Sequence, residues 1–285
     1  MSSLDNTIFT QESTLDTKIF IQVVRMTARI VDIQWNEIPF EYFPNITSEA
    51  ILETSDSPTD GWEELTKITR SSPPFFLDEG TKATYYRFPV LYYRIRFPEV
   101  NKVTRVFSTE KLPNYYGAEI SRRHAIRLKE GHEGNLMYLF IRKKFVDHCP
   151  ECWDSIRGTR SKANCPHCLN TGFLGGFYNP IGVYISVSPE GTVIRQEVDG
   201  TSVSGQLNAW TTGFPRINVG DVLVDANTRD IWHVGQVSMT THKRTVTKQE
   251  LAMSHQDEDT YIFKLLERVP LNPSKGDLRH GEILF

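Results

Sequence analysis

Four cysteines in two closely spaced pairs are the residues whose types and spacing point most directly to a chemistry. Cys149 and Cys152 form the first pair, and after twelve intervening residues Cys165 and Cys168 repeat the spacing. The chain has no other cysteine. Each Cys-x-x-Cys turn can present two thiolates to one side, and two such turns at this separation can surround one tetrahedral Zn²⁺. We therefore expect a zinc site with these four cysteines as ligands.

Disulfides and free thiols are the alternatives to a bound metal. Disulfides persist in oxidising compartments, whereas this sequence opens without a signal-peptide pattern, so we expect a reducing setting that favours thiolates bound to metal. Four thiolates leave no open position for water, which predicts a structural zinc and not a catalytic one. His148 and His167 adjoin the cysteines and could replace a ligand. With four thiolates available, we interpret both histidines as neighbours of the site or surface residues.

The segment between the two pairs has little else to stabilise it. Trp153 and Ile156 are its only sizeable apolar residues. A structural zinc contributes roughly 10–16 kcal/mol, comparable to the net stability of about 5–15 kcal/mol of a whole domain. We therefore expect this segment to fold only with its metal.

The composition is that of a folded soluble protein. A chain of 285 residues with 39% hydrophobic and 24% charged residues is long enough for two or three domains. The net charge of -3 argues against a protein that binds nucleic acid mainly by neutralising phosphates. No apolar run approaches the roughly 20 residues that cross a bilayer, so we expect no membrane segment.

Short β-strand patterns dominate both sides of the cysteine pairs, which predicts a mainly β fold. Before the cysteines, strands are expected within 21–35, 65–68, 84–88 and 90–97, separated by turns rich in Pro, Gly and Ser. Asp32-Ile33-Gln34-Trp35 and the stretch from Asp60 to Leu65 resemble strands of fibronectin type III or immunoglobulin-like modules. That resemblance implies an N-terminal β-sandwich. The tyrosines at 85, 86, 92 and 93 could form a platform for a sugar or a base, but we interpret them as packing residues.

The period of the pattern changes between Tyr115 and Glu130. Ile120, His124 and Leu128 recur at helical spacing, which predicts a short amphipathic helix, and residues 136–146 then read as a buried strand leading into the first cysteine pair. The glycines that follow the second pair, from Gly172 to Gly176, lack the Lys-Ser/Thr end of a phosphate loop, so we interpret them as structural.

The C-terminal part returns to strand patterns. Strands are expected at 181–187, 192–198, 222–224, 231–237 and 261–265, with a short helix at 247–254, and together they predict a small β-barrel. The expected organisation is a flexible arm (1–17), an immunoglobulin or fibronectin-like β-sandwich (18–113), a helix, strand and zinc-ribbon segment (114–180), a small β-barrel (181–270) and a tail (271–285).

Basic residues near the cysteines allow a second functional hypothesis. Arg122-Arg123, Arg142-Lys143-Lys144 and the loop residues Arg157, Arg160 and Lys162 could contact DNA phosphates or an acidic partner. Acidic residues interleave with them, so we favour a solvated surface. A zinc-ribbon protein that binds nucleic acid remains the alternative.

No pattern of catalytic residues is present. The sequence has no serine elbow, no His-Glu-x-x-His helix, no phosphate loop and no dinucleotide fingerprint. Acidic runs such as Glu63-Glu64 and Asp257-Glu258-Asp259 fall in polar stretches, and His233 follows Trp232 in an alternating strand, so we interpret them as surface or packing residues. We expect a protein that is not an enzyme.

The order of these motifs resembles structural proteins of tailed bacteriophages. The resemblance covers about residues 115–265 and is most specific from Cys149 to Pro180, where Cys-Pro-x-Cys is repeated and followed by Thr-Gly-Phe-x-Gly-Gly-Phe-Tyr-x-Pro. It implies a virion component, assembled in the host cytoplasm, at the neck between head and tail or in the baseplate. It also implies a homo-oligomeric ring and contacts with portal, connector, tail or baseplate proteins.

Overall fold

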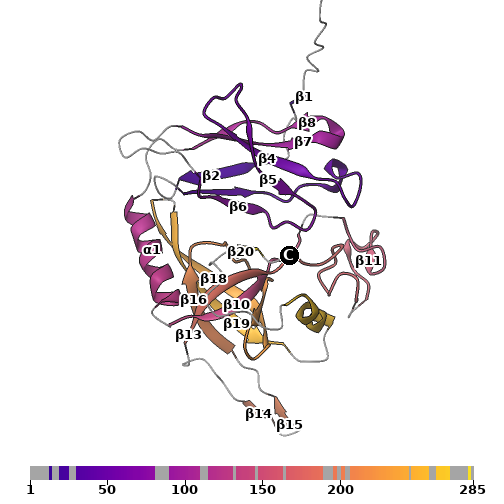
Figure 1. Ribbon diagram of the computed structural model, residues 1–285. Coiled ribbons are helices and arrows are strands. Elements are labelled where there is room, and N and C mark those ends of the chain that lie inside the picture. The colour runs from indigo at the N-terminus through magenta and orange to yellow at the C-terminus, as the bar shows by residue number, and fades with distance from the viewer. Residues whose placement is uncertain are drawn as a thin grey trace, which may run out of the picture.

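The structure is a computed structural model that describes residues 13–14, 19–25, 30–80, 90–109, 115–130, 133–144, 147–162, 165–188, 195–197, 200–202, 206–243, 245–256, 261–269 and 282–283. Strands dominate these residues, as the mainly β prediction requires. Figure 1 shows an N-terminal β module above a barrel, with the cysteine segment beside the barrel.

The N-terminal module contains two sheets that share one core. The first sheet has the order β1-β8-β7-β4-β5, with β9 also paired to β7, and the second has the order β2-β3-β6. Buried side chains from both sheets, among them Ile33 and Trp35 from one and Leu52 and Ile95 from the other, form a single apolar cluster. The strands are β1 (Ser13–Thr14), β2 (Ile21–Arg25), β3 (Val31–Trp35), β4 (Ala50–Ser55), β5 (Glu63–Ile68), β6 (Phe75–Asp78), β7 (Tyr92–Phe97), β8 (Lys102–Val103) and β9 (Phe107–Ser108).

Several expectations for this module can be compared with the structure. The run 21–35 contains two antiparallel strands, β2 and β3. The expected strand at 84–88 lies outside the described residues. Tyr93 is fully buried and its hydroxyl donates to Asp78, which fits a packing role. The immunoglobulin or fibronectin-like identity of the module stays a prediction.

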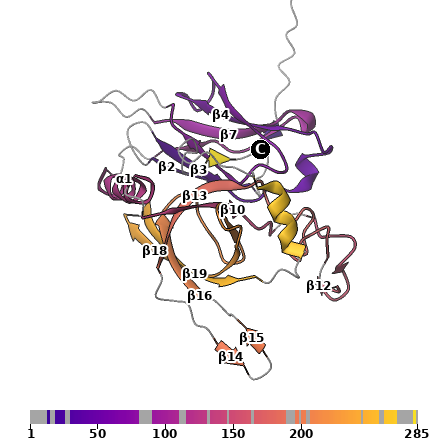
Figure 2. The ribbon, with the colours of Figure 1, turned by 60° about the horizontal axis from the view of Figure 1, so that its bottom comes forward.

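The second body is a closed β-barrel of antiparallel strands. Its order is β10-β17-β18-β19-β16-β13, and β13 pairs with β10 to close the circle (Figure 2). Met137, Val183, Leu223 and Leu251 belong to the apolar cluster that fills it. The barrel strands are β10 (Asn135–Phe140), β13 (Ile181–Ser188), β16 (Gln206–Thr212), β17 (Val222–Asp225), β18 (Ile231–His242) and β19 (Thr245–His255).

The barrel begins earlier than the predicted range of 181–270. β10 was predicted to be a strand of the cysteine segment, but it pairs with both β13 and β17 and is part of the barrel wall. Its two faces are both buried: Met137 and Leu139 point into the barrel core, whereas Tyr138 and Phe140 belong to a second cluster outside it. The continuous apolar run of β10 follows from this double burial.

Two predicted elements in the C-terminal part are wrong. Residues 247–254 form part of β19, not a helix, and Thr247, Gln249 and Leu251 are buried in alternation, as the side chains of a strand are. Residues 261–265 begin the 3-10 helix η4 (Tyr261–Arg268), not a strand. Ile262 and Leu265 of η4 pack in the outer cluster with Tyr138 and Phe140.

The predicted helix is confirmed as α1 (Tyr115–Lys129), which lies on the outside of the barrel (Figure 1). Leu128 is fully buried, and His124 packs edge-on against Trp210 of β16 at 5.4 Å between ring centroids. The face predicted from the helical spacing is therefore the one that contacts the barrel.

Short elements complete the described part of the chain. β14 (Arg195–Glu197) and β15 (Gly200–Ser202) form a hairpin that projects from the barrel, within the region of the expected strand at 192–198 (Figure 2). The segments expected to be an arm and a tail each contribute one short strand: β1 pairs with β8, and β20 (Glu282–Ile283) pairs with β13. The module and the barrel meet where Phe75 packs edge-to-face on Phe214, with ring centroids 5.0 Å apart. Among the described helices, none has the length and apolar character needed to cross a bilayer.

Candidate metal centre

The cysteines lie in a compact insertion between two neighbouring strands of the barrel. We call residues 147–176 the cysteine lobe. It follows β10 and precedes β13, and it contains a small hairpin of β11 (Trp153–Asp154) and β12 (Thr159–Arg160) (Figure 1). The sequence predicts a separate segment at 114–180, before the barrel. Because β10 and β13 pair with each other, the lobe is instead an insertion within the barrel.

The two chain segments that enter and leave the lobe pair with each other and form its stem. Arg142 is bridged to Phe177, and His148 to Phe173, in antiparallel fashion. The Lys143 N–H group donates to the Gly176 carbonyl oxygen at 3.0 Å. The stem therefore connects the barrel strands directly to the first cysteine.

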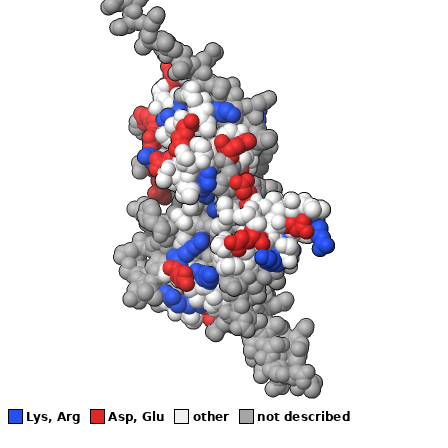
Figure 3. All heavy atoms as spheres, turned by 90° about the vertical axis from the view of Figure 1, so that its right-hand side faces the viewer, with Lys and Arg blue, Asp and Glu red and all other residues white. Residues whose placement is uncertain are grey.

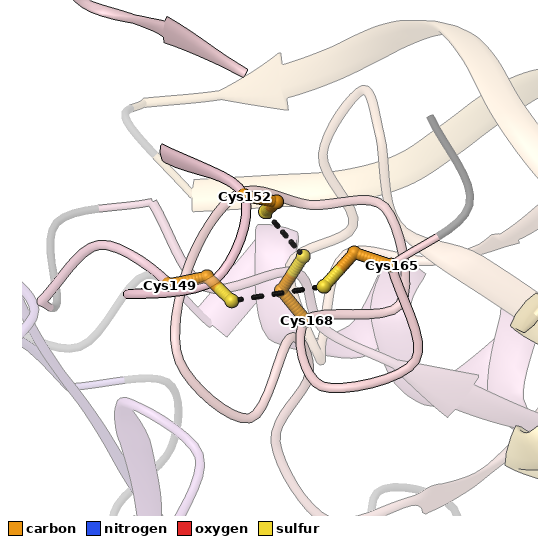
Figure 4. Close-up of side chains that lie close together, drawn as sticks. All are labelled: Cys149, Cys152, Cys165 and Cys168. Atoms are coloured by element: carbon orange, nitrogen blue, oxygen red, sulfur yellow. Dashed lines mark hydrogen bonds between the residues drawn. The ribbon is translucent and has the colours of Figure 1, made fainter. Parts of the chain in front are cut away.

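The four sulfur atoms converge on one point inside the lobe (Figure 4). The Cys149 and Cys165 sulfurs are 3.7 Å apart, those of Cys152 and Cys168 are 3.3 Å apart, and all four lie within 4.8 Å of one another. A disulfide requires about 2.05 Å between sulfurs, so none of these thiols is paired by a covalent bond. The structure thus brings together all four predicted ligands.

These distances fit a tetrahedral metal site. Four sulfurs at about 2.3 Å from a central Zn²⁺ would be about 3.8 Å from one another, close to the spacing of the four thiols here. The donor set is four sulfurs alone, which suits a thiophilic ion such as zinc. All four positions of a tetrahedral ion would be filled by protein.

The cysteines are almost completely shielded from solvent. Their exposed fractions are 0%, 1%, 4% and 0% in chain order, and they form an apolar cluster of their own. Burial and the neighbouring thiols raise the pKa of Cys152. Burial also acts to raise the pKa of Cys165, but the N–H groups of Cys168 and His167, together with the thiols of Cys168 and Cys149, lower that pKa to about 7. Four thiolates in such a space need a cation to balance their charge.

Backbone geometry after the second pair holds the sulfurs in place. Leu169 and Asn170 both have positive φ, and the Asn170 side-chain oxygen accepts the Cys165 N–H at 2.9 Å. The Thr171 hydroxyl donates to the Cys168 carbonyl oxygen at 2.7 Å. Gly176 has a φ of 66°, and a Cβ atom there would lie 2.7 Å from the same carbonyl oxygen. The glycines of this stretch therefore permit a tight turn around the site.

The two histidines beside the cysteines make other contacts. His148 stacks on Trp153, with ring centroids 3.6 Å apart and planes at 1°, and also packs on Phe173. His167 points to Glu151, with its Nε2 atom 2.9 Å from a carboxylate oxygen. Neither belongs to the group of side chains that could hold a metal.

The basic residues near the lobe are interspersed with acidic ones, as the face in Figure 3 shows. Within the lobe, Arg157 lies 3.7 Å from Asp154. Arg122 and Arg123, which the sequence groups with the lobe, lie on α1 on the other side of the barrel, where Glu119 binds both at 2.8 Å (Figures 1 and 2). Lys143 is only 6% exposed. These pairings reduce the positive potential that a phosphate backbone would meet.

Sequence reasoning missed the residues that support the site from a distance. Arg142 donates to the Thr171 carbonyl oxygen at 3.0 Å, and Glu37, which belongs to the N-terminal module, accepts the Lys144 N–H at 3.0 Å. From the sequence, Arg142 is expected only on a basic surface. Glu37 precedes Lys144 by 107 residues, so no local pattern could connect them.

Comparison with known proteins does not add an identity to this geometry. No family model matches the chain, and no curated protein matches it in sequence. Any assignment of function therefore rests on the residues and their arrangement.

Proposed function

We propose that this chain is a structural component of a tailed-bacteriophage particle, at the neck between head and tail or in the baseplate, and that the cysteine lobe holds a structural Zn²⁺. The chain carries out no reaction at this site. Its partners are portal, connector, tail or baseplate proteins, together with further copies of itself in a ring. It is made in the host cytoplasm and ends in the virion.

The observation that carries a structural role is the closed set of four buried sulfurs. A catalytic zinc keeps a position for water or substrate, and here the four thiolates would occupy every position. Among the described residues of the lobe, the sulfur cluster and the stack of His148, Trp153 and Phe173 form the interior, and Leu169 packs instead in the cluster outside the barrel. Metal binding would supply the stability that burial does not.

The assignment to a phage particle is supported by the sequence resemblance over residues 115–265 and by the β architecture. Two β bodies in firm contact, joined through Phe75 and Phe214, suit a rigid building block of an assembly. Nucleic-acid binding has less support, because Arg157 of the lobe lies beside Asp154. Arg122 and Arg123 pair with Glu119 on the other side of the barrel and add nothing to a basic surface at the lobe.

The test of this proposal is incorporation into particles. A tagged chain, supplied to cells that produce particles without the native copy, should restore complete particles and sediment with them. Cys152→Ser should abolish this, whereas Ser155→Ala, an exposed change in the same lobe, should not. Complete particles that form without the tagged chain, or that never contain it, would contradict the proposal.

A parallel measurement tests the alternative. Anisotropy of a labelled DNA duplex, titrated with the protein at about 50 and about 200 mM salt, reports phosphate contacts by the loss of affinity between the two. We expect no binding that shows this salt dependence. Tight binding with a steep salt dependence would favour a nucleic-acid-binding protein.

A further inference from the structure

The junction between the N-terminal module and the stem of the cysteine lobe contains a cluster of polar side chains, of which Lys143 and Tyr178 are buried and Glu37 is partly buried. Glu37 lies just after β3, in the module, whereas Lys143 and Tyr178 lie on the two strands of the stem. Lys143 and Tyr178 are each 6% exposed. Buried polar groups of this kind are expected to have a specific role, because removing them from water is unfavourable unless they are paired.

The Glu37 carboxylate contacts both segments of the stem. Its Oε1 atom accepts the Tyr178 hydroxyl at 2.7 Å, and its Oε2 atom accepts the Lys144 N–H at 3.0 Å. One carboxylate from the module therefore fastens the segment that enters the lobe and the segment that leaves it.

Two further contacts strengthen the junction. The Lys143 ammonium group lies over the Tyr178 ring, 5.2 Å from its centroid, and the Asn179 N–H donates to the Ser71 carbonyl oxygen of the module at 3.2 Å. Burial lowers the pKa of Lys143, an effect that the charge of Glu37 opposes. The space left at the junction, lined by Trp35, Glu37, Arg70, Tyr178 and others, is only about 20 Å³, enough for a single water molecule.

The same stem is continuous with the metal ligands. Lys144 precedes Cys149 by five residues, and the stem bridge of His148 with Phe173 lies between the junction and the sulfurs. The Cys149 N–H donates to the Gly172 carbonyl oxygen at 2.9 Å, and the Leu174 N–H donates to the Asp147 carbonyl oxygen at 2.9 Å. If the lobe loosens, these bonds should weaken, and the stem residues that meet Glu37 belong to the same two chain segments.

We propose that Glu37, Lys143 and Tyr178 form a latch that couples the metal state of the cysteine lobe to the contact between the N-terminal module and the barrel. With metal bound, the stem is ordered and presents Tyr178 and Lys144 to Glu37. Without metal, the stem loosens and the module is held to the barrel by its remaining contacts only. This latch rests on the proposed function, because it requires a metal ion in the cysteine lobe. It adds a way in which that metal fixes the position of the N-terminal module on the barrel.

Thermodynamic linkage makes the latch testable from both sides. If metal strengthens the contact at Glu37, the contact at Glu37 must strengthen metal binding by the same factor. Tyr178→Phe removes one oxygen atom and Glu37→Gln removes one charge, and neither touches a cysteine. We expect each variant to bind zinc at least about five-fold more weakly than the unaltered protein.

The experiment uses the full chain. Zinc affinity is measured by competition with a chromogenic chelator, with Tyr116→Phe, an exposed tyrosine on α1, and Glu64→Gln, an exposed glutamate on β5, as matched controls. Amide hydrogen exchange of the unaltered protein is compared with and without zinc at residues 36–38 and 70–75, which belong to the module and not to the lobe. Removal of zinc should increase exchange at both segments.

The outcomes separate the latch from the proposed function. Weaker zinc binding in Tyr178→Phe and Glu37→Gln, with unchanged binding in both controls, supports the latch. The latch is overturned if both variants bind zinc as tightly as the unaltered protein, or if amide exchange at 36–38 and 70–75 is the same with and without zinc. Either result leaves the proposal of a structural zinc standing. If a variant does not fold, the exchange measurement on the unaltered protein decides alone. A protein that binds no zinc at all removes both proposals.

Discussion

Replacing Asp32 with asparagine should stabilise this protein above neutral pH. Asp32 lies on β3, and its carboxyl group faces a small space shared with Gly213, Phe214 and Arg216 of the barrel. Its Oδ2 atom accepts Gln34 Nε2 at 2.8 Å, but its buried Oδ1 atom has no partner among the described residues. Burial raises the pKa of Asp32 from 3.8 to about 7, although Gln34 and Arg216 both act to lower it.

The size of the effect follows from this pKa. Each pKa unit corresponds to about 1.36 kcal/mol, so the interval from 3.8 to about 7 corresponds to about 4 kcal/mol. The folded protein holds the Asp32 proton more tightly than the unfolded chain does. Protonation of Asp32 therefore contributes its full share to the free energy of unfolding below pH 3.8, and this contribution is lost as the pH rises through about 7. Asparagine keeps an oxygen for Gln34 and never acquires a charge. Above pH 7 the variant should be more stable by about 4 kcal/mol.

The assay is urea unfolding followed by tryptophan fluorescence at pH 5 and pH 8. Between these values the unaltered protein should lose about 3 kcal/mol more of its free energy of unfolding than Asp32→Asn does. Burial also raises the pKa of Asp221 to about 7. Because Asp221 is present in both proteins, each should still lose some stability between pH 5 and pH 8. Asp56→Asn, an exposed change in the same module, is the control. A variant that is less stable than the unaltered protein at pH 8, or that shows the same pH dependence, would refute the reasoning.

Two further substitutions test the lobe and the barrel. Gly176→Ala should weaken zinc binding about ten-fold or more, because the residue has a φ of 66° and its Cβ atom would lie 2.7 Å from the Cys168 carbonyl oxygen. Gly158→Ala is the control: Gly158 has a φ of 61°, but no atom lies within 4 Å of its Cβ position, so zinc binding in the same chelator competition should weaken far less. Equal effects of the two variants would argue against the steric explanation. Gln249→Leu should destabilise the barrel by about 3 kcal/mol or more in urea unfolding, because the buried Gln249 amide bonds the Thr212 and Pro215 carbonyl oxygens and the Ile217 N–H. Gln236→Leu, an exposed change on β18, is its control, and a similar loss in both would contradict the claim.

The parts of the fold that depend on local chemistry could be predicted from the sequence. Two Cys-x-x-Cys pairs need only their own turns and one loop to meet, and their sulfurs do meet. The helix α1 follows from the spacing of Ile120, His124 and Leu128, since one face of a helix is set by residues three and four apart.

The predictions are wrong where pairing between strands far apart in the sequence determines the structure. Residues 247–254 contain good helix formers, yet pairing with β16 and β18 makes them a strand. The barrel range was wrong because β10 and β13 are neighbours across the whole cysteine lobe, a contact that no local pattern encodes. For the same reason Glu37, which lies 141 residues before Tyr178, could not be connected with the stem.

The central claim is that the four cysteines hold one zinc ion in a closed site with no reaction at it. The most direct test is X-ray absorption at the zinc edge on the purified protein, combined with its metal content. We predict one zinc per chain with four sulfur atoms at about 2.3 Å and no lighter ligand. A folded protein without metal whose four thiols all react with a thiol reagent, or a zinc with oxygen or nitrogen in its first shell, would contradict the claim.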